Sequence, residues 1–146
     1  MLKNDLDLAM KAAMKSGDTI RRDILRVVLT NIKLAEVEKG AALDDAAVIS
    51  LLQKEVKTHK ESIEGAQKAN RQDLVDQYTT EMHILEEYLP AQMNETELRE
   101  IVKAAIAESG ATSTADMGKV MKTVLPKVEG KASNSDVSRI VREMLV

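Results

Sequence analysis

The chain has 146 residues, of which 44% are hydrophobic and 31% are charged, a composition typical of a folded globular protein rather than a disordered one. It has no Cys, which excludes disulfides, thiolate metal sites and cysteine nucleophiles. Phe and Trp are also absent. A net charge of −3 excludes a general nucleic-acid binder, so any polyanion would have to bind a local basic patch.

The start of the chain predicts a structural helix rather than a secretion signal. Acidic side chains lie among the first turns of residues 1–18, and no apolar signal core is present there. The longest apolar runs are only a few residues, too short to span a bilayer. A cytoplasmic protein is therefore expected.

Residues 1–90 predict an N-terminal lobe of about four helices. Apolar residues recur at three- and four-residue spacing, without sustained alternation, which is typical of helices and not of strands. The predicted helices cover about residues 2–16, 18–39, 44–65 and 70–88. Pro90 lacks an amide N–H and restrains Leu89, so it is predicted to end the fourth helix and the lobe.

Apolar stripes on these helices predict the faces that form a core. In chain order, the stripes contain Leu2, Leu6, Met10, Met14, Ile20, Ile24, Val27, Val28, Leu29, Ile32, Val48, Leu52, Val56, Ile63, Leu74, Tyr78, Met82, Leu85 and Leu89. His59 falls on the third stripe and is predicted to be a core-edge histidine rather than a metal ligand. His83 falls off the fourth stripe and is predicted to be solvent-exposed.

Residues 91–146 predict a three-helix domain, so the expected fold is all-α. Asn94 and Glu97 have capping-box spacing, and Ser133 is a cap candidate for the last helix. The predicted helices cover about residues 94–110, 113–125 and 133–145. Because the middle stripe continues to Val128, Pro126 is predicted to kink the last turn of its helix instead of ending it.

No constellation for catalysis is visible in the sequence. The two histidines are 24 residues apart and form no HExxH pair, and the GxxxxGK[ST], GxGxxG and GxSxG motifs are absent. Adjacent carboxylates such as Glu86 and Glu87 point different ways around a helix and make a poor acid–base pair. We therefore expect no catalytic residue, no cofactor and no metal.

A set of six cations near the end of the chain is the strongest chemical feature. They comprise Lys119, Lys122, Lys127, Lys131, Arg139 and Arg142. Beside the N–H groups of a helix start near Ser133, such a set is suited to phosphates. The alternative is a solvated helix face, since two helices need not point their cations the same way. Without aromatic platforms, contacts would fall on the backbone and shape of a structured RNA.

Four strings of residues, in order along most of the chain, resemble the YqeY family. They are 60–63 (KESI), 68–76 (KANRQDLVD), 84–90 (ILEEYLP) and 115–121 (ADMGKVM), and 130–132 (GKA) fits the same pattern. The C-terminal lobe is also similar to the tail domain of GatB, a subunit of the amidotransferase that amidates Glu-tRNA(Gln) or Asp-tRNA(Asn). In that enzyme the tail lies against tRNA, while the chemistry occurs elsewhere.

The resemblance implies an all-α N-terminal lobe joined to a three-helix C-terminal lobe. It also implies the label of carbon–nitrogen ligase activity with glutamine as amido-N-donor. The chain departs from the family pattern at Thr58-His59, where relatives usually carry a basic pair. It departs again at Ser133-Asn134, which replaces a usual Asp-Gly.

Three functional hypotheses follow. The preferred one is a non-catalytic tRNA-related binding or accessory module, free-standing or docked on a translation-related protein, with the six cations as its contact set. The first alternative is a helical protein-interaction adaptor with an apolar groove between the lobes. The second is the glutamine-dependent carbon–nitrogen ligase, which is the weakest because no catalytic constellation is visible.

Overall fold

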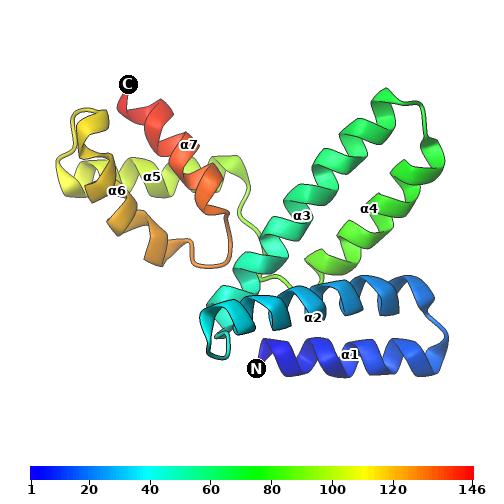
Figure 1. Cartoon of the computed structure of the whole chain (residues 1–146). Helices are drawn as coiled ribbons and strands as arrows, with labels where there is room; N and C mark the ends of the chain where they lie inside the picture. The colour runs from blue at the N-terminus through cyan, green and yellow to red at the C-terminus, as the bar shows by residue number, and fades with distance from the viewer. The chain divides into compact units, whose positions relative to one another are not determined.

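The computed structural model describes residues 1–146 and contains helices but no strands (Figure 1). The all-α prediction is therefore confirmed. The chain divides into two compact units, Met1–Leu89 and Pro90–Val146. Each unit has a separate core of aliphatic side chains, and no polar or charged residue is fully buried in either of them.

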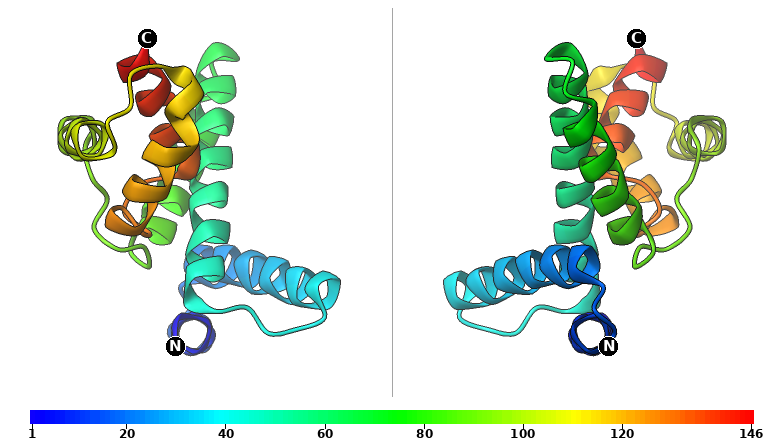
Figure 2. Two further views of the ribbon diagram at one scale, coloured as in Figure 1. Left: turned by 90° about the vertical axis from the view of Figure 1, so that its left-hand side faces the viewer. Right: turned by 90° about the vertical axis from the view of Figure 1, so that its right-hand side faces the viewer.

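Two helical hairpins make up the first unit. Its helices are α1 (Leu2–Ser16), α2 (Thr19–Lys39), α3 (Asp45–Lys68) and α4 (Gln72–Glu86). α1 packs against α2 and α3 packs against α4, and α3 crosses the α1–α2 hairpin at a steep angle (Figures 1 and 2). Buried residues of all four helices meet at this crossing.

Local signals set both ends of α2 and the start of α3, as predicted. The Asp18 carboxylate accepts a hydrogen bond from the Arg21 N–H at 3.1 Å, and Asp44 accepts one from the Ala47 N–H at 2.9 Å. Gly40 ends α2 at a φ of 74°, a left-handed conformation that glycine adopts without steric cost. These caps satisfy backbone groups that a helix end leaves unpaired.

Two helix boundaries in the α3–α4 hairpin differ from the prediction. α3 continues through Gly65 to Lys68, because glycine lowers helix propensity without forbidding the helix. The reversal occurs instead at Asn70, which has a φ of 56°. α4 ends at Glu86, before the predicted Tyr88, and the Tyr88 N–H bonds to the Leu85 carbonyl at 3.2 Å in a tighter turn before the proline.

The predicted stripe of α2 is only partly correct. Ile24, Val28 and Ile32 are buried as predicted, but Ile20 and Val27 are exposed. Met14 on α1 is exposed as well, although the stripe placed it in the core. The neighbouring helices cover one side of α2, so a second apolar row on this helix is left without a partner.

The two histidines occupy the places expected of them. The mostly buried His59 side chain lies between α3 and α4, with Nε2 at 2.9 Å from the Glu81 carboxylate and the ring edge-on to Tyr78. His83 is exposed. No group of three or more His, Asp and Glu side chains is arranged to hold a metal ion.

Arg21 ties the start of α2 to the end of α4. Its guanidinium donates to the Glu87 carboxylate at 2.7 Å and to the Tyr88 hydroxyl at 3.1 Å. The hydrogen bond to Glu87 is the main reason that the pKa of Arg21 lies above its ordinary value. This contact holds the turn between α4 and Pro90 against the start of α2.

Three α-helices and two short 3-10 turns form the second unit. They are α5 (Glu95–Ser109), η1 (Thr114–Asp116), α6 (Met117–Val124), η2 (Leu125–Lys127) and α7 (Asn134–Leu145). The predicted capping box of Asn94 and Glu97 is present, and the Ser133 hydroxyl accepts from the Asp136 N–H at 3.2 Å. Pro126 lies in η2 rather than in a kinked α-turn, and Val128 is buried as predicted.

Backbone and side-chain bonds close the second unit near Pro90. The Met93 N–H donates to the Lys131 carbonyl at 2.8 Å, and the Gln92 side-chain amide donates to the Gly130 carbonyl at 2.8 Å. The segment that enters α5 is thus fixed to the loop that precedes α7. No helix of either unit is both long and apolar enough to cross a bilayer.

We expect Leu52→Ala to lower the free energy of unfolding by about 2–5 kcal/mol, because the side chain is fully buried and its truncation leaves a cavity. Leu34→Ala removes the same atoms from an exposed position on α2 and should cost less than about 1 kcal/mol. Urea titrations followed by circular dichroism measure both. Equal losses would contradict the placement of the core.

Candidate nucleic-acid interface

All six predicted contact residues belong to the second unit, but their surroundings differ. Lys119 and Lys122 lie three residues apart on α6 and are exposed, on the side away from the buried Val120 and Val124. Neither ammonium group forms an ion pair. Both are therefore available to an external anion.

Two of the cations, Lys127 and Lys131, lie in the segment between α6 and α7. The Lys127 ammonium lies 3.2 Å from the Glu108 carboxylate, so this residue joins η2 to the end of α5. Both side chains are exposed, so the pair is weakly stabilising. The Lys131 side chain is exposed and forms no ion pair, while its backbone carbonyl accepts the Met93 N–H.

Arg139 belongs to a closed ring of four charges that joins α5 to α7. Its Nη1 atom lies 3.2 Å from the Glu95 carboxylate and 3.2 Å from that of Glu143. Arg99 binds the same two carboxylates, at 3.0 Å to Glu95 and 2.7 Å to Glu143. Each carboxylate thus lies between two guanidinium groups, and Arg139 is occupied within the fold.

The ring shifts the ionisation of all its members. Hydrogen bonds from Arg139 first, and then from Arg99, lower the pKa of Glu95. The pKa of Glu143 is lowered by Arg99 first and then by Arg139. The hydrogen bond to Glu95 is the main cause of the raised pKa of Arg139, and the hydrogen bond to Glu143 is the main cause of the raised pKa of Arg99.

Arg142 lies on the same helix as Arg139 but outside the ring. Its side chain is exposed and has no ion-pair partner. The structure therefore divides the predicted set into two groups. Two members, Lys127 and Arg139, are paired with carboxylates, and four carry no such partner: Lys119, Lys122, Lys131 and Arg142.

The start of α7 is less open to an anion than its position in the sequence indicates. The Ser133 hydroxyl already accepts the Asp136 N–H, and the Asp136 carboxylate lies in the first turn. A negative side chain at a helix start satisfies part of the local positive potential. The free side chains, rather than this helix end, are therefore the groups in this unit that are suited to phosphates.

Sequence reasoning missed the carboxylates that neutralise Arg139. Glu95 and Arg99 are four residues apart, as are Arg139 and Glu143, a spacing that brings side chains together on one helix face. That signal was available. The contacts that close the ring between α5 and α7 have sequence separations of 44 residues, and no local pattern reports them.

The ring predicts acid sensitivity of the second unit. Because the pKa values of Glu95 and Glu143 are depressed in the folded state, their stabilisation is present above the ordinary carboxyl pKa and is lost as pH falls through the depressed values. Glu143→Gln should therefore lower Tm at pH 7, by a difference that shrinks toward about pH 3. The matched control Glu100→Gln, an exposed α5 carboxylate without an ion pair, should not change Tm at either pH in thermal melts followed by circular dichroism.

Comparison with known proteins identifies relatives over almost the whole chain. One is "Altered inheritance of mitochondria protein 41, mitochondrial" of Pyrenophora tritici-repentis, 31% identical over 96% of this chain and 78% of that protein. The protein of the same name from Lachancea thermotolerans is 33% identical over 92% of this chain and 70% of that protein. These names point to mitochondria, so the expectation of a cytoplasmic location is contradicted.

A family model described as Yqey-like protein matches residues 3–145. This match confirms the resemblance carried by the strings at 60–63, 68–76, 84–90 and 115–121. With almost the full length matched, and with relatives above 30% identity over most of their own length, the chain belongs to the YqeY family.

Proposed function

We propose that this protein is a non-catalytic, tRNA-related binding or accessory module whose second unit contacts RNA phosphates. One observation carries the proposal: Lys119, Lys122, Lys131 and Arg142 are exposed and free of carboxylate partners within a single compact unit. The similarity of this lobe to the GatB tail, which lies against tRNA, supports the same function. A translation-related protein is the expected docking partner.

Charge pairing supports a contact set of four cations rather than six. Lys127 and Arg139 would have to give up bonds to Glu108, or to Glu95 and Glu143, before they could bind a phosphate. The free cations need no such exchange. Residues 90–146 carry eight basic and eight acidic side chains, so attraction to RNA must come from a local patch and not from the charge of the unit as a whole.

The same composition limits what the patch recognises. The only aromatic residues are Tyr78 and Tyr88, both in the first unit. The second unit therefore has no ring on which an unstacked base could lie. Contacts from Lys and Arg to phosphates position an RNA and give little base discrimination, so the proposed ligand is a structured RNA recognised by its backbone and shape.

The ligase label implied by the family resemblance leads to a different experiment. Purified chain alone, incubated with glutamine, ATP and mischarged tRNA, would form amidated tRNA if the label described its own activity. We expect no product, since the sequence has no Cys nucleophile and none of the catalytic motifs named above. Formation of amidated tRNA would contradict the proposal of a non-catalytic module and would show that the chain is an enzyme.

Charge reversal at Lys119 and Lys122 tests the proposed patch. Lys119→Glu/Lys122→Glu should weaken binding of fluorescent tRNA about tenfold to a hundredfold, because two phosphate contacts become repulsive. The control is Lys57→Glu/Lys60→Glu, which reverses two exposed, unpaired lysines with the same spacing on α3. Anisotropy titrations should show that the control changes affinity much less; equal effects would mean that net charge alone controls binding.

The salt dependence of the RNA affinity reports the number of phosphate contacts. With four phosphates neutralised, the slope of log K against log salt concentration should be roughly −3 to −4. An affinity that is indifferent to salt would exclude the proposed mode.

The two arginines of α7 should differ in their effect on RNA binding. Arg142→Ala removes a free cation and should weaken tRNA binding about threefold to tenfold. Arg139→Ala removes a guanidinium already held by Glu95 and Glu143, and should change affinity less than about twofold while lowering Tm. The reverse order would show that the ring opens to bind RNA.

A further inference from the structure

A second apolar row on α2 points into solvent. Six residues with alternating three- and four-residue spacing form it: Ile20, Asp23, Val27, Thr30, Leu34 and Val37. All six are exposed, and the four apolar members are 47%, 48%, 62% and 73% accessible in chain order. Alternating steps of three and four residues are the spacing of a coiled-coil seam, in which such side chains pack against another helix. We refer to these six residues as the α2 seam.

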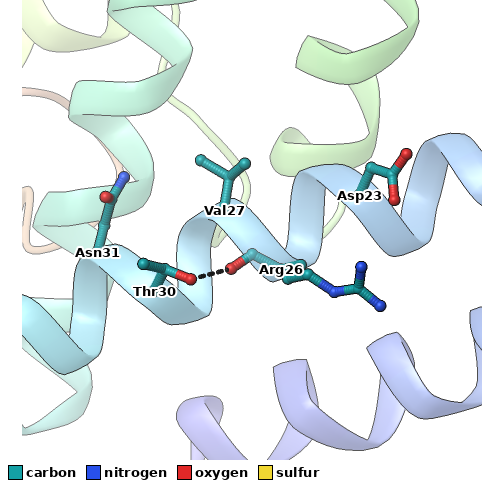
Figure 3. A pocket seen from close by; sticks show the side chains of 5 residues that line it. All are labelled: Asp23, Arg26, Val27, Thr30 and Asn31. Carbon is teal, nitrogen blue, oxygen red and sulfur yellow. Dashed lines mark hydrogen bonds between the residues drawn. The ribbon is translucent and has the colours of Figure 1, made fainter.

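The middle of the α2 seam is hollowed. An open hollow of about 380 Å³ is lined by Asp23, Arg26, Val27, Thr30 and Asn31 (Figure 3). Figure 3 shows Val27 and Asn31 on one side of the helix, with the Arg26 guanidinium directed to the other side. Val27 is the apolar side chain among the five, so a side chain of a partner helix that enters the hollow would pack on Val27 and contact polar groups around it.

Charge distinguishes the two flanks of the seam. Arg26 and Lys33 lie seven residues apart on one flank, and both are exposed without an ion pair. On the other flank Asn31 is turned inward, where its amide donates to the Glu55 carboxylate of α3 at 3.0 Å. The seam therefore offers one positively charged edge, which complements acidic side chains on an approaching helix.

A second copy of this chain fits the seam poorly. In an antiparallel pair, Arg26 of one copy would face Lys33 of the other, and like charges on flanking positions oppose pairing. In a parallel pair, Asp23 would meet Asp23 of the other copy inside the contact. Both arrangements carry an electrostatic penalty that an acidic partner avoids.

We propose that the α2 seam binds an amphipathic helix of another protein, with an apolar stripe flanked by Glu or Asp. The apolar stripe packs along Val27, Leu34 and Val37, and the acidic flank pairs with Arg26 and Lys33. This surface belongs to the first unit and does not depend on the RNA patch of the second. It gives the protein a separate attachment point for a protein partner.

Two synthetic peptides that differ only in flanking charge test the proposal. Each has the 21-residue length of α2, Leu at the seam positions and a fluorescent label; one carries Glu and the other Lys at every flanking position. The full-length chain should bind the Glu peptide at least about tenfold more tightly than the Lys peptide in anisotropy titrations. Equal affinities, or no binding of the Glu peptide, would overturn the proposal.

Surface variants then locate the binding site. Leu34→Asp should weaken Glu-peptide binding at least about tenfold, because it puts a charge in the apolar contact. The matched control Leu8→Asp changes an exposed leucine of α1 that lies outside the seam (64% accessible) and should leave the affinity within about twofold. Arg26→Glu/Lys33→Glu should invert the preference between the two peptides. Equal effects of Leu34→Asp and Leu8→Asp would place binding elsewhere.

Sedimentation equilibrium separates the second copy from the acidic partner. The native chain should sediment as a monomer in the concentration range of the titrations. A dimer that Leu34→Asp dissociates would assign the seam to self-association and would contradict the proposal.

Discussion

Burial of aliphatic side chains between helices is the interaction on which both units depend. Neither core contains Phe or Trp, and the residues that fill them are Leu, Ile, Val and Ala, such as Leu25, Leu52 and Ile140. Side chains of this kind fill space only where helix faces meet closely. Neither core includes a fully buried charged or polar residue, so the ionisable side chains lie at the surface or, like His59, at the edge of a core.

Surface charges in the second unit serve two purposes that the sequence alone does not separate. Arg99 and Arg139 pair with Glu95 and Glu143 and connect α5 to α7. Lys119 and its free neighbours have no carboxylate partner. The same residue types thus stabilise the fold or remain available to a ligand, according to whether a carboxylate of an adjacent helix lies within about 4 Å.

The first unit presents a different kind of surface. α2 has two apolar rows: Ile24, Val28 and Ile32 are buried, while Val27 and Leu34 remain exposed. In our two proposals, the free cations of the second unit contact an RNA and the exposed row of α2 contacts a helix of a protein partner. The chain belongs to the YqeY family, and both partners are proposed from the residues on its surface.

The helices, most of their caps and the absence of strands were predictable from the sequence, because these features depend on interactions within a few residues. Asn94 and Ser133 were recognisable as caps since each bonds to a backbone group three residues away. Which row of α2 is buried, and which cations are neutralised, depended on how the helices pack together. Both outcomes depend on groups brought together from distant parts of the chain, such as Arg139 and Glu95, and helical periodicity carries no information about such distances.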